Sequence, residues 1–183
     1  MDNIVEILYK IYKPIAPKHF DKNEWWIIFL FFFIGTIVYY LHKKSRLIAT
    51  SELLLIFLFN IYFASLGDYI LAMKPIDLYD TVDLDSGELF DIPLHTVVYS
   101  GTIYIALHFY LLLNPKKSHY IVFWALLLTL FEWISVHFFH LFTYKGWNLI
   151  LSFLFYLVVI TVNLILLTGV RKSFSKCKSG TKY

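Results

Sequence analysis

The sequence has little of what soluble enzymes use. Its single cysteine, Cys177, can form neither an internal disulfide nor a multi-cysteine metal site. The seven glycines build no Gly-rich phosphate loop, and we find no nucleophile elbow. Charged residues make up only 16% of the chain, and the net charge of +3 calls for no nucleic-acid partner. We therefore expect no cofactor, no nucleic-acid partner and no assignable catalytic residues.

Apolar and aromatic residues are abundant instead, at 59% and 20% of the 183 residues. A hydrocarbon core about 30 Å thick needs about 20 apolar residues per helix. Tryptophans and tyrosines stand at the ends of the apolar windows, as interfacial residues do. The predicted fold is an all-α, polytopic membrane helix bundle over residues 25–170, with five transmembrane helices at 25–41, 51–73, 94–113, 120–141 and 147–170.

Polar segments flank this bundle. The N-terminal arm, 1–24, lacks the residue order of a cleavable signal peptide, so we expect it to stay on the mature protein. Its isoleucines and leucine fall at helical spacing before Pro14 and Pro17, which predicts a short interfacial helix, with a flexible polar arm as the alternative. The loop 74–93 carries six acidic residues, and the tail 171–183 is basic.

The lysines and arginines predict how the chain is threaded. They concentrate between the first and second windows, between the third and fourth, and after the fifth. By the positive-inside rule these segments are cytoplasmic. The N-terminus is then outside, the C-terminus is cytoplasmic, and the acidic loop 74–93 is extracytoplasmic.

Four of the windows carry small or polar residues at spacings of three and four, whereas 25–41 does not and is predicted to face lipid. Asp68 and Glu132 are the carboxylates placed well inside the windows, where a charge costs roughly 2.5–3.5 kcal/mol. The depth of each residue predicts that the polar faces meet. The predicted polar intramembrane cluster, a candidate binding site, is Asp68, His95, Tyr99, Glu132, His137, His140, Ser152 and Tyr156.

This cluster has a plain structural interpretation as well. Glu132 can be protonated, or hydrogen-bonded to Tyr156, Thr129 or Asn60, and simply fix the packing of helices. The histidines can lie at a wet rim of the bundle. A Zn²⁺ site would need three or more converging ligands, and no HExxH spacing is present, so metal binding is left open.

Three stretches carry a family resemblance: GDYILAMKPIDLYD, ALHFYLLLNPKK and FEWISVHFFHLFTYKGWNLILSFLFY. Together they resemble an uncharacterised family of small five-helix integral membrane proteins of spore-forming Firmicutes. The resemblance implies the same helix order and a bacterial cell (plasma) membrane location, but no activity. The positions it singles out are Asp68, Asp77, Asn114, Pro115, Glu132, Trp133, Tyr144, Trp147, Ser152 and Tyr156.

The function predicted from these features is that of a non-enzymatic multi-pass membrane protein, structural or binding a ligand or partner through its polar cluster. One alternative is a proton- or cation-coupled carrier or channel, and another is a metal-assisted membrane enzyme. The expected partners are the lipid bilayer and either a second copy of the chain or another membrane protein.

Overall fold

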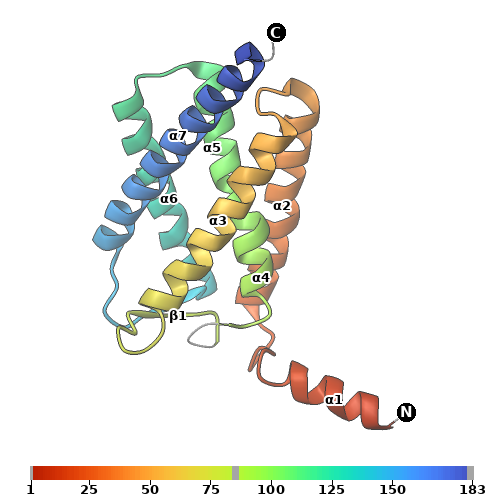
Figure 1. Cartoon of the computed structure of the whole chain (residues 1–183). Helices are drawn as coiled ribbons and strands as arrows, with labels where there is room; N and C mark the ends of the chain where they lie inside the picture. Colours follow the sequence, from red (N-terminus) through yellow and green to blue (C-terminus); the bar gives the residue numbers. More distant parts are fainter. Residues whose placement is uncertain (1, 84–86, 181–183) are drawn as a thin grey trace.

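The computed structural model describes residues 2–83 and 87–180, and it is a helical bundle with one small β-ribbon (Figure 1). Five helical segments are long and apolar enough to cross a membrane, which confirms the all-α class and the multi-pass character of the chain. These segments are α2 (Lys22–Ser45), α3 (Thr50–Leu71), the continuous run of α4 (Asp91–Pro93), η1 (Leu94–Tyr99) and α5 (Ser100–Leu113), then α6 (Lys117–Phe139) and α7 (Leu149–Gly180).

α2 and α7 extend furthest beyond their predicted windows. α2 starts at Lys22 because Asp21 and Glu24 form a capping box, in which the Asp21 N–H donates to Glu24 Oε2 at 2.6 Å. α7 continues to Gly180, into the segment 171–183 that was predicted as a tail. Asp85 of the acidic loop and residues 181–183 lie outside the described residues.

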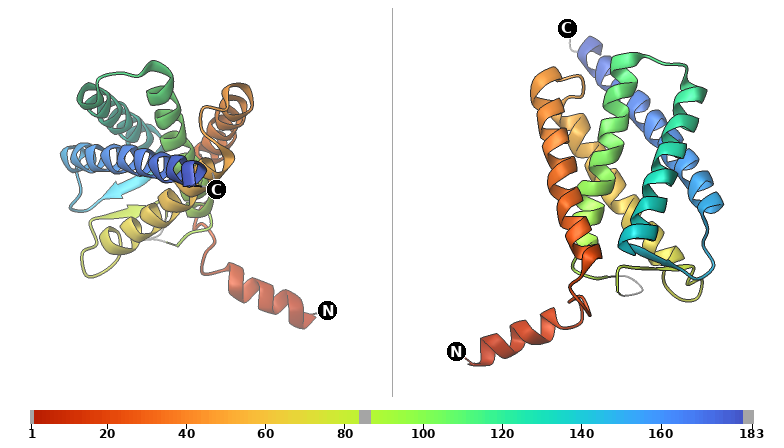
Figure 2. Two further views of the ribbon diagram at one scale, coloured as in Figure 1. Left: turned by 45° about the horizontal axis from the view of Figure 1, so that its top comes forward. Right: turned by 180° about the vertical axis from the view of Figure 1, so that it is seen from behind.

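The η1–α5 segment is the centre of the bundle. It packs against α2 and α3, and α5 also contacts α7 (Figure 2). Tyr104 and Leu107 of α5 are almost fully buried, as is Leu94 of η1. α6 and α7 form an antiparallel pair of their own. The bundle therefore consists of a three-helix group and a two-helix hairpin that meet along a seam.

The prediction that 25–41 faces lipid is wrong for one side of that helix. Ile27, Leu30, Ile34 and Val38 recur every three or four residues and are buried. A Cβ atom added at Gly101 would lie 2.7 Å from Cγ2 of Ile34, so the glycine lets α2 and α5 approach closely. The polar residues of the sequence did not indicate this contact, because apolar side chains and a glycine form it.

The N-terminal arm forms helix α1 (Asp2–Tyr12), which projects away from the bundle (Figure 1). Ile4, Leu8 and Ile11 are exposed on it. Two hydrogen bonds link the following segment to the loop before α4, each at 2.8 Å. Leu89 N–H donates to the carbonyl of Ile15, and His19 N–H donates to the side-chain oxygen Oδ2 of Asp83.

A β-ribbon, missed by the sequence analysis, joins the two connections at the α1 end of the bundle. β1 (Tyr79–Thr81) pairs antiparallel with β2 (Phe142–Tyr144), with Tyr79 opposite Tyr144. Lys145 beside β2 bonds to carboxylates of Asp77 and Asp80, each at 2.6 Å. The ribbon therefore links the three-helix group to the α6–α7 hairpin.

Candidate functional site

A cavity of about 150 Å³ lies at the seam, below the ribbon. Residues from α2, α3, η1, α5, α6, α7 and the ribbon line it, and polar side chains from four of the membrane-length helical segments converge on this one space. Most of the remaining wall is apolar or aromatic. Its polar lining consists of Asn60, Asp68, Tyr79, Tyr99, Thr102, Glu132, Ser135, Tyr144, Trp147, Ser152 and Tyr156.

Glu132 of α6 is buried and receives three hydroxyl donors. Tyr144 Oη and Ser152 Oγ donate to its Oε1, the serine at 2.7 Å, and Tyr156 Oη donates to its Oε2 at 2.6 Å. Trp147 Nε1 in turn donates to Ser152 Oγ at 2.7 Å and orients it. An ionised carboxylate only accepts hydrogen bonds, so this set of donors suits the anion.

Of the partners predicted for Glu132, only Tyr156 is found. Thr129 Oγ1 donates instead to the carbonyl of Ala125, one turn earlier on α6. Asn60 forms a reciprocal amide pair with Asn163 of α7, with N···O distances of 2.8 and 3.0 Å. This asparagine pair joins α3 to α7, and Asn60 is its cavity-lining member.

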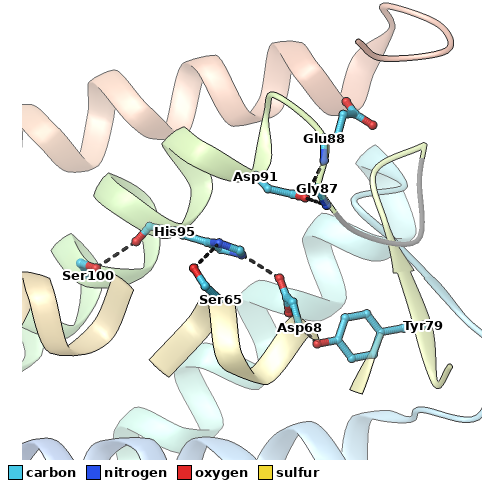
Figure 3. Close-up of polar contacts among 8 residues, drawn as sticks. All are labelled: Ser65, Asp68, Tyr79, Gly87, Glu88, Asp91, His95 and Ser100. Carbon is cyan, nitrogen blue, oxygen red and sulfur yellow. Dashed lines mark hydrogen bonds and ion pairs between the residues drawn. The ribbon is translucent and has the colours of Figure 1, made fainter. Parts of the chain in front are cut away.

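Asp68 of α3 forms the second polar group (Figure 3). Tyr79 Oη donates to its Oδ1 at 2.7 Å, and His95 Nε2 lies 2.7 Å from its Oδ2. The other ring nitrogen of His95 lies 3.3 Å from Ser65 Oγ. His95 stands on the π-helical turn η1, where Ser100 Oγ donates to its carbonyl at 2.9 Å. π-Helical turns are frequent at functional sites.

The order Asp68–His95–Ser65 is that of a catalytic triad, but its setting does not support hydrolysis. Ser65 is exposed on the side of α3 and lies inside a regular helix. The neighbouring backbone N–H groups are bonded within α3, so they cannot stabilise an oxyanion. We therefore assign Ser65 and Asp68 the role of orienting His95.

The structure does not bring His137 and His140 into the cluster. His137 is exposed and stacks on Trp133, with ring centroids 5.4 Å apart. His140 is exposed at the C-cap of α6, with a left-handed φ of 52°. Both point away because they lie about 140° and 80° around α6 from Glu132 at 100° per residue. Among the described residues, no group of three or more His, Cys, Asp or Glu side chains could hold a metal ion.

Tyr79 and Tyr144 are site residues that the sequence analysis did not place in the cluster. Burial, together with the adjacent carboxylates of Asp68 and Glu132 respectively, raises the pKa of each phenol. Both phenols therefore keep their protons and act as donors. Aromatic and β-branched residues in YDT and FTY were the available signal for two short strands, but the pairing of such short strands cannot be read from sequence.

Two further carboxylates, Glu88 and Asp91, lie at the start of α4 (Figure 3). Asp91 Oδ2 accepts hydrogen bonds from the N–H groups of Gly87 and Glu88, at 2.8 and 3.0 Å. Glu88 is 1% exposed, and its Oε1 has no hydrogen-bond partner among the described residues. Burial raises the pKa of Glu88 to about 7, so this group takes up a proton near neutrality.

No protein-family model matches this chain, and comparison with curated proteins and with solved structures gives no match either. The resemblance to a five-helix family therefore stays a prediction.

Proposed function

We propose that this multi-pass membrane protein is a non-enzymatic binding protein that takes up a small molecule in the seam cavity. The observation that carries the proposal is the convergence of Asp68 and Glu132, from two different helices, on one space of about 150 Å³. Helices held together only for stability pack to high density with few voids. A void of this size accepts a molecule as large as benzene in an engineered protein.

The proposed orientation puts the cavity on the outer side of a bacterial cell membrane. The ribbon and the acidic residues lie at one end of the bundle. Basic residues lie at the opposite helix ends: Lys43 and Lys44 are in the last turn of α2, and Lys117 is the first residue of α6. The positive-inside rule assigns that basic end to the cytoplasm. The cavity is then nearer the outer surface, so its ligand would come from outside the cell or from the outer leaflet.

A second candidate function is a proton- or cation-coupled carrier, and the contact that favours it is the Asp68–His95 pair. An imidazole at 2.7 Å from a carboxylate can hold or pass a proton beside the cavity. Five helices are few for a monomeric carrier, so this function would involve a homo-oligomer. Proton flux into liposomes that is equal for the wild type and Asp68→Asn would exclude it.

The binding proposal is tested by filling the cavity. Ala64 lines it on α3, and Ala64→Phe adds a ring to the space; Leu58→Phe, at a position 67% exposed on the same helix, is the matched control. Native mass spectrometry of protein purified gently from membranes should show a bound small molecule in the wild type and in the control, and none in Ala64→Phe.

Thermal unfolding establishes whether Ala64→Phe is folded, and Gly67→Leu supplies a second cavity-lining variant if it is not. A wild type that carries no bound mass, and that no compound in a screen of small amines, alcohols, acids and sugars stabilises, would refute the proposal. Equal bound mass in the wild type and in both filled variants would also refute it, because the molecule would then be bound elsewhere.

A further inference from the structure

Resting on the proposed function, we infer that the ligand of the seam cavity is a small organic cation, a protonated amine with an apolar body. Three independent properties of the wall point to this class: an excess of hydrogen-bond acceptors, two carboxylates with no lysine or arginine in the lining, and aromatic faces. None of them depends on the family resemblance.

The acceptor excess follows from the hydrogen bonds of the lining residues. A carboxylate offers about four lone-pair sites. Glu132 uses three of them and Asp68 uses two, for bonds to neighbouring side chains. Acceptor sites therefore remain on both carboxylates, ready for a ligand that donates.

Donors, by contrast, are already engaged. Besides the hydroxyls that serve the two carboxylates, Thr102 Oγ1 donates to the carbonyl of Val98 at 2.6 Å, and Ser135 Oγ donates to that of Phe131 at 2.9 Å. Among the described polar residues of the lining, Tyr99 alone has a hydroxyl with no hydrogen-bond partner. A ligand that mainly accepts hydrogen bonds, such as a carboxylate or a phosphate, would find almost nothing to bind.

Charge leads to the same class. The described lining contains Asp68 and Glu132 but no lysine or arginine. His95, 2.7 Å from Asp68, lies outside the lining, and Glu132 has only hydroxyl partners. Lys145, next to β2, is not part of the lining either, and it bonds to Asp77 and Asp80. In the low dielectric of a membrane protein, an attraction between opposite charges is many times stronger than in water. The cavity therefore repels anions and attracts cations.

The aromatic walls add selectivity for a cation with a compact apolar part. Tyr99, Tyr156, Trp147, Phe63 and Phe155 all line the cavity. A cation near an aromatic face is attracted by the electrons of the ring, and cages of aromatic rings are a known means of binding ammonium groups. A ligand with one ring or a short alkyl chain and one ammonium group fits both the volume and the chemistry.

The test compares three probes of similar shape: benzylamine, benzyl alcohol and benzoate. Binding to the purified full-length protein is measured as a concentration-dependent rise in melting temperature and as an equilibrium Kd at pH 7.5. We expect benzylamine to bind at least tenfold more tightly than benzyl alcohol, and benzoate not to bind. Asp68→Asn should weaken benzylamine binding at least tenfold, whereas Glu6→Gln, the same kind of charge removal on exposed α1, should leave the Kd unchanged.

Tyr156→Phe keeps the inference testable if Asp68→Asn does not fold. It removes one donor from Glu132 Oε2 and frees an acceptor, so benzylamine should bind at least as tightly as to the wild type.

Equal binding of benzyl alcohol and benzylamine would overturn the cation inference while leaving the binding proposal intact. Benzylamine binding that Asp68→Asn, Glu132→Gln and Ala64→Phe all fail to weaken would place the amine outside the cavity and overturn the inference too. A molecule that is bound to the wild type, that none of the three probes displaces and that proves neutral or anionic would refute the cation inference but not the binding proposal.

Discussion

Replacing Glu132 with glutamine should destabilise the bundle, although the two side chains have nearly the same shape. A glutamine oxygen can still accept from Tyr144 and Ser152, but its amide nitrogen then faces the hydroxyl of Tyr156, which has lost its acceptor. A hydrogen bond to a charged group contributes about 1.5–3 kcal/mol, and a buried donor without a partner costs about 1–3 kcal/mol. We expect a loss of about 2 kcal/mol in the free energy of unfolding.

A double-mutant cycle with Tyr156→Phe isolates this effect. In the wild type, Tyr156→Phe should cost about 1.5 kcal/mol, because it removes a charge-assisted hydrogen bond. In the Glu132→Gln background it should cost little, because the hydroxyl proton of Tyr156 no longer has an acceptor there. The expected coupling is therefore about 1.5 kcal/mol, within the range for contacting residues. Tyr62→Phe, at a position 67% exposed, should be neutral in both backgrounds.

The measurement is reversible unfolding in mixed micelles with a rising fraction of denaturing detergent, followed by circular dichroism. A Glu132→Gln protein within about 0.5 kcal/mol of the wild type, with additive effects in the cycle, would refute the reasoning. That result would mean that Glu132 carries a proton and that glutamine replaces it without loss, in which case the cavity would hold one negative charge fewer.

Three further predictions concern other parts of the molecule. Because burial raises the pKa of Glu88 from 4.5 to about 7, the contribution of this group to stability is fully present below pH 4.5 and should fall by up to about 3 kcal/mol as the pH rises to 7. Glu88→Gln should remove this component from unfolding measured against pH, and an unchanged pH dependence would assign it to another group. Gly101→Ala should destabilise the protein by about 1–2 kcal/mol, because the added Cβ would clash with Ile34. Gly67→Ala, whose Cβ would have no atom within 4 Å, should not destabilise it. Equal effects of the two changes in the same unfolding assay would contradict the close approach of α2 and α5. A fluorophore attached to Leu8→Cys, in a Cys177→Ser background, should be quenched by lipids that carry a quencher within the bilayer, because α1 has an apolar face that the bundle does not cover. A fluorophore on Leu8→Cys that is as exposed to water as one on Glu6→Cys would show that α1 stays in solution.

The sequence was informative where helical periodicity and hydrophobicity decide the structure. Length and apolar content were enough for the five membrane-length helices, and the spacing of Asp68, Glu132 and Ser152 was enough to place them on facing sides of their helices. Periodicity says nothing about which loops pair. The ribbon was therefore not predicted, and neither was the position of the donors Tyr79 and Tyr144 at the site.

The sequence analysis did not predict the π-turn η1, and it wrongly included His137 and His140 in the cluster. The regular spacing of 100° per residue places His95 by its position in an ideal α-helix, whereas the π-turn η1 changes the geometry locally. His137 and His140 were included because they lie at a suitable depth, but depth is only one coordinate, and their angle around α6 directs them outward. Direction around the helix axis decided membership in the site.

The division into a three-helix group and a hairpin bears on how the protein is made. During synthesis, Glu132 on α6 enters the membrane before Ser152 and Tyr156, which follow on α7. Until α7 emerges, the carboxylate lacks two of its three donors, and at mid-membrane an isolated charge costs roughly 2.5–3.5 kcal/mol. α6 should therefore insert together with α7 as a preformed hairpin, and a ribosome stalled between them would leave a glutamate that holds α6 at the translocon.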